Sequence, residues 1–444
     1  MRRQLKSVGE KVPRSIGRIA ARIPYAWRLG AEFKATQHRI QQIEAAAPDA
    51  RAEQAGLWLK AVVAHHADKS QLYRDHLGEA AQSLGSVNGT DALRRFSSLP
   101  VLTKQILQGL LVEQPSSPSN GAMRINTGGT SGNPLSFFVD KNAFAREWAH
   151  MHTIWRKLGY HPTSLKLTFR GKNLGKRALR YNAVHNEIHV NPYLPFEVTA
   201  KAVAKVAPNI DYLHGYPSSI YEFVRQSTES PSLGDDVLVG FQKRLRGIFY
   251  GSEFPAPLYR DFVDDVVGVP SISWYGHSEM CILAYETDRN VYVPMHSYGF
   301  TETIPTDDEG EFLIGTSYFN TETPFVRYNT GDLVSSTSAN GFVESFQVLQ
   351  GRVGDFVTDR HGQRISLTAL IFGRHHKFFD VGQFVQVRQT EPGKMTLLVV
   401  LPENVLTDDL ASQFDLSNVA IDCDFEVRST PVRTPAGKMP LLVD

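Results

Sequence analysis

The chain has 444 residues, of which 42% are hydrophobic and 21% charged, a composition that excludes intrinsic disorder and predicts a globular protein of two or three domains. Its 47 basic and 46 acidic side chains nearly cancel, which excludes a strongly basic nucleic-acid-binding protein, so we expect no nucleic-acid partner. Two cysteines, Cys281 and Cys423, are too few for a disulfide framework or a cysteine-built zinc site.

Positive charge is concentrated in the first thirty residues. They contain eight Lys or Arg and one acid, Glu10, whereas the rest of the chain has 39 basic and 45 acidic side chains. Arg14, Arg18 and Arg22 recur every four residues among isoleucines and predict a helix with a basic and an apolar side. Such a helix docks on its own protein, rests on an anionic membrane surface or serves as a transit peptide, and docking is the commonest of these.

Membrane insertion is not predicted. No apolar run approaches the ~18 residues that span a bilayer, and no apolar block follows the basic start as it would in a secretory signal. We therefore expect a cytoplasmic protein, with peripheral membrane contact open only through the basic helix.

Residues 1–99 predict helices, most clearly the segment "AGLWLKAVVAHHADKSQLYRDHL" at 55–77. Two short strands on either side of a Gly-rich loop follow between Ile125 and Asp140. Asp140 then predicts the cap of a helix. The apolar face of that helix, which we expect in the core, consists of Phe144, Trp148, Met151, Trp155 and Leu158.

Apolar strands alternate with helical patterns over residues 165–275. The strands are "LKLTF", "IDYL", "LRGIFY" and "SISWY", and the helices lie near "VTAKAVAKV", after Pro217 and near "PLYRDFVDDVVG". Such alternation predicts βαβ units and a mainly parallel sheet. We expect an α/β protein with a multi-layer large domain that also contains a β-rich region, marked by "EFLIGTSYF" and "TPFVRYNTGDLV".

The domain organisation predicted from these patterns has three parts. Residues 1–99 form an N-terminal helical region, and residues 100–351 form the nucleotide- and substrate-binding core of the large domain. Residues 352–444 show a hairpin, helix and strand pattern that predicts a small, mobile α+β C-terminal domain.

The Gly-rich loop predicts a phosphate site. Its six central residues are Thr127, Gly128, Gly129, Thr130, Ser131 and Gly132, and successive N–H groups with hydroxyls form a cradle for phosphate oxygens. It is not a Walker loop, because Gly132 is followed by Asn133 and Pro134 and then by a strand. From this stretch alone, a polar hairpin without a ligand is an equal alternative.

Three strand ends carry polar loops: "HGYPSS", "GSEFP" and "GHSEM". Because the carboxyl ends of parallel strands meet at one edge, we expect these loops to converge on one crevice. Five side chains on these loops either line an acyl pocket, where their aromatic character favours a planar or aryl acid, or simply pack. They are Tyr216, Pro217, Phe249, Tyr250 and His277.

"YGHSEM" supports two interpretations. Gly276-His277-Ser278 resembles the nucleophile elbow of serine hydrolases, but Met280 occupies the position where the sharp turn requires Gly. In the other interpretation Glu279 is a carboxylate ligand of Mg²⁺ and Ser278 donates a hydrogen bond to phosphate.

Six motifs in order, "TGGTSGNP", "GSEFP", "YGHSE", "RYNTGDL", "GRVGD" and "TPAGKM", resemble the core motifs of the adenylate-forming enzymes that include acyl-CoA synthetases. "HGYPSSIYEF" and "VRYNTGDLV" are similar to the phenylacetate-CoA ligase branch and its capsule-biosynthesis and coenzyme F390 synthetase relatives. The resemblance begins near Ile125 and extends to the C-terminus. It implies an ATP- and Mg²⁺-dependent ligase that activates a small carboxylic acid as an acyl-adenylate and most often forms a CoA thioester.

The resemblance also implies roles for the motif residues. Thr127 to Gly132 hold the β- and γ-phosphates, and Glu279 holds Mg²⁺. Tyr275 and Gly276 contact adenine, with Tyr275 stacking on it. The turn that lines the adenine pocket consists of Gly251, Ser252 and Glu253. Asp332 accepts both ribose hydroxyls, and Arg352 adds a second nucleotide contact.

Two implied roles belong to the small domain. Lys438 bridges the substrate carboxylate and the α-phosphate, for which a compact ammonium on a flexible stem is suited. Asp355 is the hinge about which the domain turns between adenylation and acyl transfer.

The sequence departs from the family at two places. Asn133 stands where many relatives have Lys, which removes one contact to pyrophosphate. The Cys/His zinc cluster of some ligases is represented only by Cys281, Glu286 and His296, so we expect no metal there.

Alternative functions stay open. The acyl group passes to CoA, or to an amine or sugar in a polysaccharide pathway. A serine hydrolase using Ser278 and a non-catalytic nucleotide-binding accessory protein are the alternatives from other classes.

Overall fold

The computed structural model describes residues 17, 21–108, 114–126, 135–170, 174–192, 194–306, 310–350, 356–362, 364–367, 370–371, 376–380, 382–401, 409–416, 419–433 and 439–443. The chain forms two compact units. The first unit comprises residues 1–18, 163–271 and 350–444, and the second comprises residues 19–162 and 272–349. Most of the predicted basic helix lies outside the described residues.

The first unit contains the predicted parallel sheet. Its strands are β3 (Lys166–Phe169), β4 (Leu179–Asn182), β5 (Glu187–Val190), β6 (Tyr212–Gly215) and β7 (Gly247–Tyr250), in the order β7-β6-β3-β5-β4. β7, β6, β3 and β5 are parallel, while β4 is antiparallel to β5. The βαβ prediction is therefore confirmed here, with an antiparallel strand at one edge.

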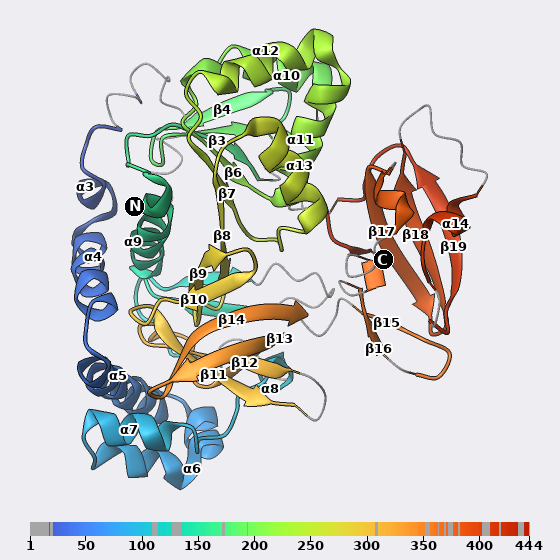
Figure 1. Cartoon of the computed structure of the whole chain (residues 1–444). Helices are drawn as coiled ribbons and strands as arrows, with labels where there is room; N and C mark the ends of the chain where they lie inside the picture. The colour runs from blue at the N-terminus through green and yellow to red at the C-terminus, as the bar shows by residue number, and fades with distance from the viewer. Residues whose placement is uncertain are drawn as a thin grey trace. The chain divides into compact units, whose positions relative to one another are not determined.

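Helices cover one face of this sheet (Figure 1). They are α10 (Phe196–Ala204), α11 (Pro217–Glu229), α12 (Pro231–Gln242) and α13 (Pro257–Val267). Proline occupies the first position of α11, α12 and α13, where its missing N–H costs nothing and its fixed φ suits the helix. Leu167, Ile188, Leu213 and Ile248, which lie opposite one another on neighbouring strands, pack with these helices in one hydrophobic core.

The rest of the first unit is a small mixed sheet with its own core. Its strands are β17 (Phe384–Glu391), β18 (Lys394–Val400), β19 (Asp422–Arg428) and β20 (Leu442–Val443), in the order β19-β18-β17-β20, with α14 at Leu410–Gln413 and a hairpin of β15 (Phe356–Thr358) and β16 (Arg364–Ser366). β17 is antiparallel to β18, and the edge strands are parallel to their neighbours. Val357, Phe378, Val387 and Leu397 are fully buried in its core.

The second unit contains an antiparallel sheet. Its strands are β8 (Ser271–Gly276), β9 (Leu283–Asp288), β10 (Val291–Pro294), β11 (Gly299–Pro305), β12 (Glu311–Ser317), β13 (Tyr328–Ala339) and β14 (Phe342–Gln350), in the order β11-β12-β13-β14-β10-β9-β8. A separate hairpin joins β1 (Met123–Asn126) and β2 (Ser136–Val139). The "SISWY" strand, predicted with the parallel series, pairs antiparallel with β9 within this unit.

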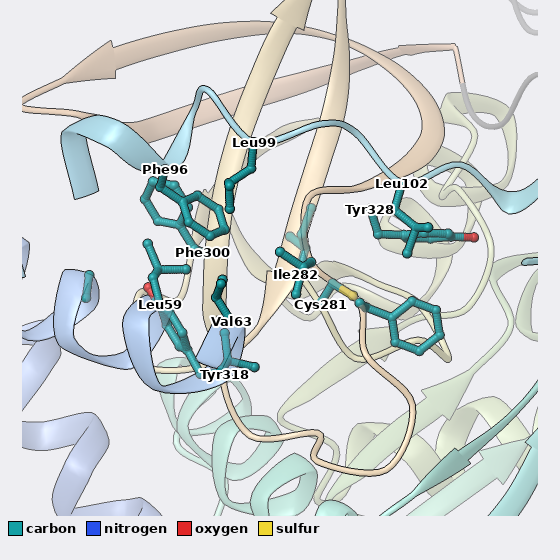
Figure 2. Packing of buried hydrophobic residues seen from close by; sticks show 14 of the residues in the cluster. Leu59, Val63, Phe96, Leu99, Leu102, Cys281, Ile282, Phe300, Tyr318 and Tyr328 are labelled. Carbon is teal, nitrogen blue, oxygen red and sulfur yellow. The ribbon is translucent and has the colours of Figure 1, made fainter. Parts of the chain in front are cut away.

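Helices of the N-terminal region share a core with that sheet. They are α3 (Tyr25–Leu29), α4 (Ala31–Glu44), α5 (Pro48–Lys69), α6 (Gln71–Gly85) and α7 (Gly89–Phe96), followed by α8 (Lys104–Gln108). Figure 2 shows Leu59 and Val63 of α5 in one cluster with Phe96, Phe300 and Ile282. The helices therefore share this core with Cys281 and Ile282, which follow the "YGHSE" motif and precede β9.

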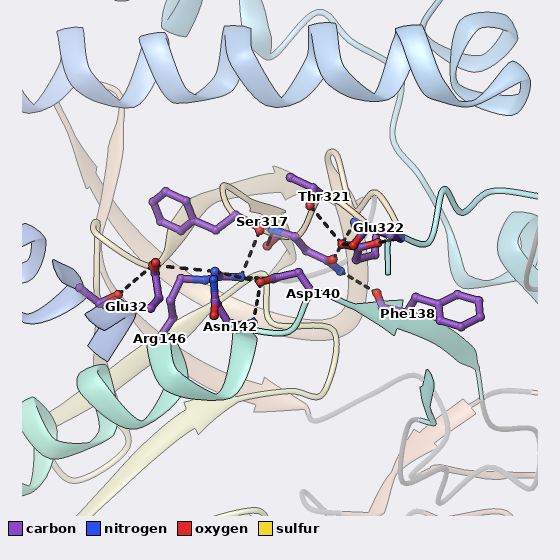
Figure 3. A network of polar contacts seen from close by, with 12 residues as sticks. Glu32, Phe138, Asp140, Asn142, Arg146, Ser317, Thr321 and Glu322 are labelled. Atoms are coloured by element: carbon purple, nitrogen blue, oxygen red, sulfur yellow. Dashed lines mark hydrogen bonds and ion pairs between the residues drawn. The ribbon is translucent and has the colours of Figure 1, made fainter. Parts of the chain in front are cut away.

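Helix α9 (Ala143–Trp155) differs from its prediction. Asn142 precedes its first turn, and Asp140 instead accepts from Asn142 N (2.8 Å) and pairs with Arg146. Figure 3 shows Arg146 also facing Glu32, 3.9 Å away. Met151 and Trp155 are buried as predicted, but Phe144 is 41% exposed, because small alanines and polar histidines take the rest of the buried face, which an apolar stripe does not reveal.

In the described part of the chain no helix is long and apolar enough to cross a membrane.

Three histidines in the second unit are buried without charge. Burial, assisted by His65, lowers the pKa of His66 to about 3. Burial is also the main cause that lowers the pKa of His150 and of His296 to about 4. His66 Nε2 donates to the Asn320 carbonyl (3.1 Å), which ties α5 to the loop after β12.

These depressed pKa values predict acid sensitivity. Unfolded histidines titrate near pH 6.5, so below that pH the unfolded chain binds protons that the folded chain does not. The free energy of unfolding is therefore highest above pH 6.5 and falls as the pH is lowered toward 4. The loss is up to about 1.4 kcal/mol per pH unit for each histidine. We expect His66→Gln, which keeps a donor for Asn320, to reduce the loss between pH 6.5 and 5 by up to about 2 kcal/mol, measured by urea unfolding. His65→Gln is the control, and an equal reduction in both variants would contradict the assignment.

Candidate functional site

The end of β8 and the bend in β13 are joined by a hydrogen bond between two predicted nucleotide residues. Tyr275 Oη donates to Asp332 Oδ2, and the two residues are 57 positions apart. The Tyr275 ring is partly exposed and meets Phe346 edge-on, with centroids 5.2 Å apart and an interplanar angle of 89°. The aromatic ring and the carboxylate are thus fixed beside each other.

An irregularity in β13 directs Asp332. Leu333 pairs with Phe312 and Asn329 with Ile314, so β13 has two more residues than β12 over this stretch. Thr330 Oγ1 donates to the Leu313 carbonyl (2.9 Å) and accepts from Asp332 N (3.2 Å). Extra residues of this kind redirect a side chain, which explains why "NTGD" interrupts an otherwise regular strand.

Glu279 is buried, with only 4% of its surface exposed, and both of its carboxylate oxygens are held. Oε1 accepts from Tyr328 Oη (3.0 Å), and Oε2 lies 3.2 Å from His277 Nδ1. Tyr328 is the first residue of β13, so this bond is a second link between the "YGHSE" and "RYNTGDL" motifs. Sequence reasoning missed Tyr328, although it lies within a quoted motif.

The geometry of Ser278 does not support the hydrolase alternative. Within the described residues no imidazole is hydrogen-bonded to Ser278, and the neighbouring His277 is directed to Glu279. The turn residue with positive φ is Met280 (56°) and not Ser278, whereas an elbow nucleophile occupies the sharp turn itself.

Two of the predicted loops meet at the carboxyl edge of the parallel sheet in the first unit. Gly251 N donates to the Gly215 carbonyl (3.0 Å), and Ser218 Oγ donates to Glu253 Oε2 (2.6 Å). Gly215 has φ 143°, and a Cβ there would lie 2.1 Å from the Phe169 carbonyl oxygen, so only glycine fits. Ser252 has φ 69°, a strained conformation that is typical of ligand-contacting turns.

The predicted acyl-pocket residues divide between packing and edge positions. Phe249 and Tyr250 are fully buried on opposite faces of β7, where Phe249 stacks on Tyr212 with centroids 4.6 Å apart. Tyr216 and Pro217 lie at the start of α11. His277 lies in the second unit, with 5% of its side chain exposed.

The remaining predicted site residues lie outside the described residues. They are the loop residues Thr127, Gly128, Gly129, Thr130, Ser131 and Gly132, together with Arg352, Asp355 and Lys438.

A narrow hollow lies beside Met280 in the second unit. Its walls include Arg146, Glu147, His150 and Phe319. It has room for about one water molecule and is therefore too small for an organic acid.

A resident metal cluster is absent from the described residues, where no three His, Cys, Asp or Glu side chains are arranged to hold an ion. Cys281 is fully buried, and His296 packs edge-on against Phe342. Glu279, three residues after the predicted adenine contact Gly276, offers a carboxylate that fits Mg²⁺, because that ion takes one or two carboxylates and completes its shell with phosphates and water.

The Tyr328–Glu279 hydrogen bond can be tested against a matched tyrosine. Tyr328→Phe leaves a buried carboxylate with one donor fewer, so we expect a loss of about 1–3 kcal/mol in unfolding free energy. Tyr318 lies in the same core, and within the described residues its hydroxyl has no hydrogen-bond partner, so Tyr318→Phe should be neutral or stabilising. Urea unfolding of both variants checks this, and equal losses would argue against the role of the bond.

Comparison with known proteins gives few sequence matches. No family model matches the chain. Protein CapK of Staphylococcus aureus is 22% identical over 249 residues, which is 54% of each protein. The chain thus spans about half the length of the curated relative that it matches.

Solved structures match over most of the chain. The 2-hydroxyisobutyryl-CoA ligase in the postadenylation state, in complex with R3-HIB-AMP, has a TM-score of 0.63 at 15% identity, covering 89% of this chain and 90% of the ligase. The same ligase with 2-HIB-AMP and CoA has a TM-score of 0.53 at 16% identity, covering 89% and 90%. The acyl acid amido synthetase AtGH3.15 in complex with 2,4-DB has a TM-score of 0.54 at 13% identity, covering 84% and 81%. The chain therefore has the fold of the adenylate-forming enzymes, as its ordered motifs predict.

Proposed function

We propose that this protein is an ATP-dependent carboxylate ligase. The substrate carboxylate attacks the α-phosphate of ATP and expels pyrophosphate, and the acyl-adenylate then passes its acyl group to the CoA thiol and releases AMP. The observation that carries the proposal is the pair of hydrogen bonds, Tyr275 to Asp332 and Tyr328 to Glu279, which join an aromatic ring, a ribose acceptor and a metal-binding carboxylate.

The nucleotide-binding role follows from the chemistry of these groups. An aromatic ring at position 275 offers a stacking surface for adenine. The Asp332 carboxylate, held by Tyr275, accepts hydrogen bonds from the ribose hydroxyls. The turn from Gly251 to Glu253 and Arg352 are proposed to complete the nucleotide contacts.

Phosphate charge is the main barrier in this chemistry, because nucleotidyl transfer depends on fixed donors and cations around the oxygens. Mg²⁺ held by Glu279 would neutralise phosphate charge. His277 and Tyr328 orient the Glu279 carboxylate, so it does not have to reorganise when it binds a cation. The loop from Thr127 to Gly132, with Ser278, is proposed to supply phosphate donors.

Lys438 is proposed as the catalytic cation that bridges the carboxylate and the α-phosphate, on a small domain that turns about Asp355. The small domain is proposed to comprise residues 352–444, the large-domain core residues 100–351, and the helical region residues 1–99. Activation of a carboxylate needs a cation at this point, because both reacting groups are anionic.

The acceptor is proposed to be CoA, with an amine or a sugar as the alternative. Support for CoA comes from the CoA ligase whose fold this chain shares, and support for an amine comes from the amido synthetase with a similar score. The CapK match, together with the motif resemblance to capsule-biosynthesis relatives, supports a role in a polysaccharide pathway.

The function is tested by ATP–pyrophosphate exchange with a panel of aryl, fatty, hydroxy and amino acids. We expect Mg²⁺-dependent exchange with one class, followed by product formation that depends on CoA or on an amine. Hydrolysis of esters with labelling of Ser278 by a fluorophosphonate, and no exchange with any acid, would favour the hydrolase.

Lys438→Ala should lower exchange about 10²-fold or more, which is the scale of removing one preorganised charged donor. AMP binding, measured by calorimetry, should be unchanged because the nucleotide contacts lie elsewhere. Lys394→Ala is the matched control, since Lys394 is half-exposed and pairs with Asp424 on the surface. Equal exchange by the Lys438 variant and the parent would refute the catalytic role.

A further inference from the structure

Arg170 lies at the ligand-facing edge of the parallel sheet in the first unit. It directly follows β3, whose last residue, Phe169, accepts a hydrogen bond from Tyr216 N (3.0 Å). Gly215 in turn accepts from Gly251 N (3.0 Å). Arg170 therefore shares this edge with two loops of the proposed site, and ligands of α/β sheets bind at such edges.

In the described part of the chain, no acidic side chain pairs with the guanidinium of Arg170. Within the described residues its hydrogen-bond partner is His214 Nε2, 3.5 Å away, and its Nε is buried without a partner. His214 is 1% exposed. Burial, followed by the nearby Arg170 and Lys166, lowers the pKa of His214 well below its usual value. A neutral imidazole accepts a hydrogen bond but does not compensate the charge of Arg170.

The buried carboxylate nearby is already committed. Glu187 Oε1 accepts from Asn182 Nδ2 (3.0 Å) and lies 3.2 Å from His189 Nε2, and Oε2 accepts from Thr168 Oγ1 (3.2 Å). Burial alone would raise the pKa of Glu187, but His189 and the fully buried Lys166 outweigh it and hold that pKa well below its usual range. Within the described residues, the oxygens of Glu187 are thus occupied by these partners, and none of its contacts is with Arg170.

The chain beyond Arg170 adds positive charge. Residues 170–180 contain five Lys or Arg and no acid. The buried Asn191 anchors this loop by donating from Nδ2 to the carbonyls of Gly175 (2.9 Å) and Arg177 (3.1 Å). Lys176 and Arg177 are exposed. A half-buried guanidinium without a counter-charge is costly, and the segment that follows it in sequence offers no acid to pair with it.

We propose that Arg170 binds an oxyanion of a reactant, a carboxylate or a phosphate, which is distinct from the carboxylate that is activated. Its planar fork can donate two parallel hydrogen bonds to such a group. The inference rests on the proposed function for the identity of the reactant: the oxyanion is either a second acidic group on the acyl substrate or a phosphate of the acceptor.

Thermal unfolding of the full chain tests the site without catalysis. Inorganic phosphate or malonate, compared with chloride at equal ionic strength, should raise the Tm of the parent and of Arg177→Gln but not of Arg170→Gln. In chloride, Arg170→Gln should be as stable as the parent or more so, because it removes an unpaired charge. Equal anion-induced shifts in all three proteins, or a Tm for Arg170→Gln several degrees below the parent in chloride, would overturn the proposal.

Exchange assays then identify the reactant. If the acyl substrate supplies the oxyanion, Arg170→Gln should raise the KM for 4-carboxyphenylacetate about 10-fold or more and leave that for phenylacetate unchanged. If the acceptor supplies it, the variant should affect thioester formation with CoA but not with dephospho-CoA. An Arg170-dependent anion shift without exchange for any acid would refute the ligase and keep the site, whereas exchange without such a shift would refute the site and keep the ligase.

Discussion

Two tyrosine–carboxylate hydrogen bonds hold the candidate site together. Tyr275 and Asp332 are 57 residues apart in sequence, and Tyr328 and Glu279 are 49 residues apart. Arg327 directly precedes Tyr328 and connects it to the helical region. It is 5% exposed, pairs with Glu302 (3.1 Å) and donates to the carbonyls of Ser97 and Leu99. The helical region, the antiparallel sheet and the site therefore depend on one another in the second unit.

Much of the fold could be predicted from the sequence, because buried parallel strands appear as short apolar runs and helices begin at proline. The motif order predicted the superfamily fold, and the structure joins Tyr275 of "YGHSE" to Asp332 of "TGD" by a hydrogen bond. The α9 face was predicted in part, because Met151 and Trp155 are buried there but small and polar residues take the place of Phe144. Tyr328 and Arg170 were missed because their importance depends on what lies opposite them in space, which residue spacing does not encode.

The two sheets handle charge differently. In the second unit, buried acids are paired with arginines, as Glu302 is with Arg327 and Asp140 with Arg146. On the polar face of the first unit's sheet, Lys166 and Glu187 compensate each other, while the partner of Arg170 among the described residues is the neutral ring of His214. An internally balanced core stabilises the fold, whereas an unbalanced edge is suited to a ligand that brings its own charge.

The second unit is discontinuous, because residues 163–271 of the first unit are inserted between its two segments. Leu59 and Val63 of α5 pack with Phe300 and Tyr318, which are made more than two hundred residues later. During synthesis at about 5–20 residues per second, the apolar face of α5 stays exposed for tens of seconds until the strands that cover it have been made. The inserted parallel sheet is contiguous in sequence and can form in the meantime. Until then the emerging chain exposes an apolar helical surface that chaperones would have to shield.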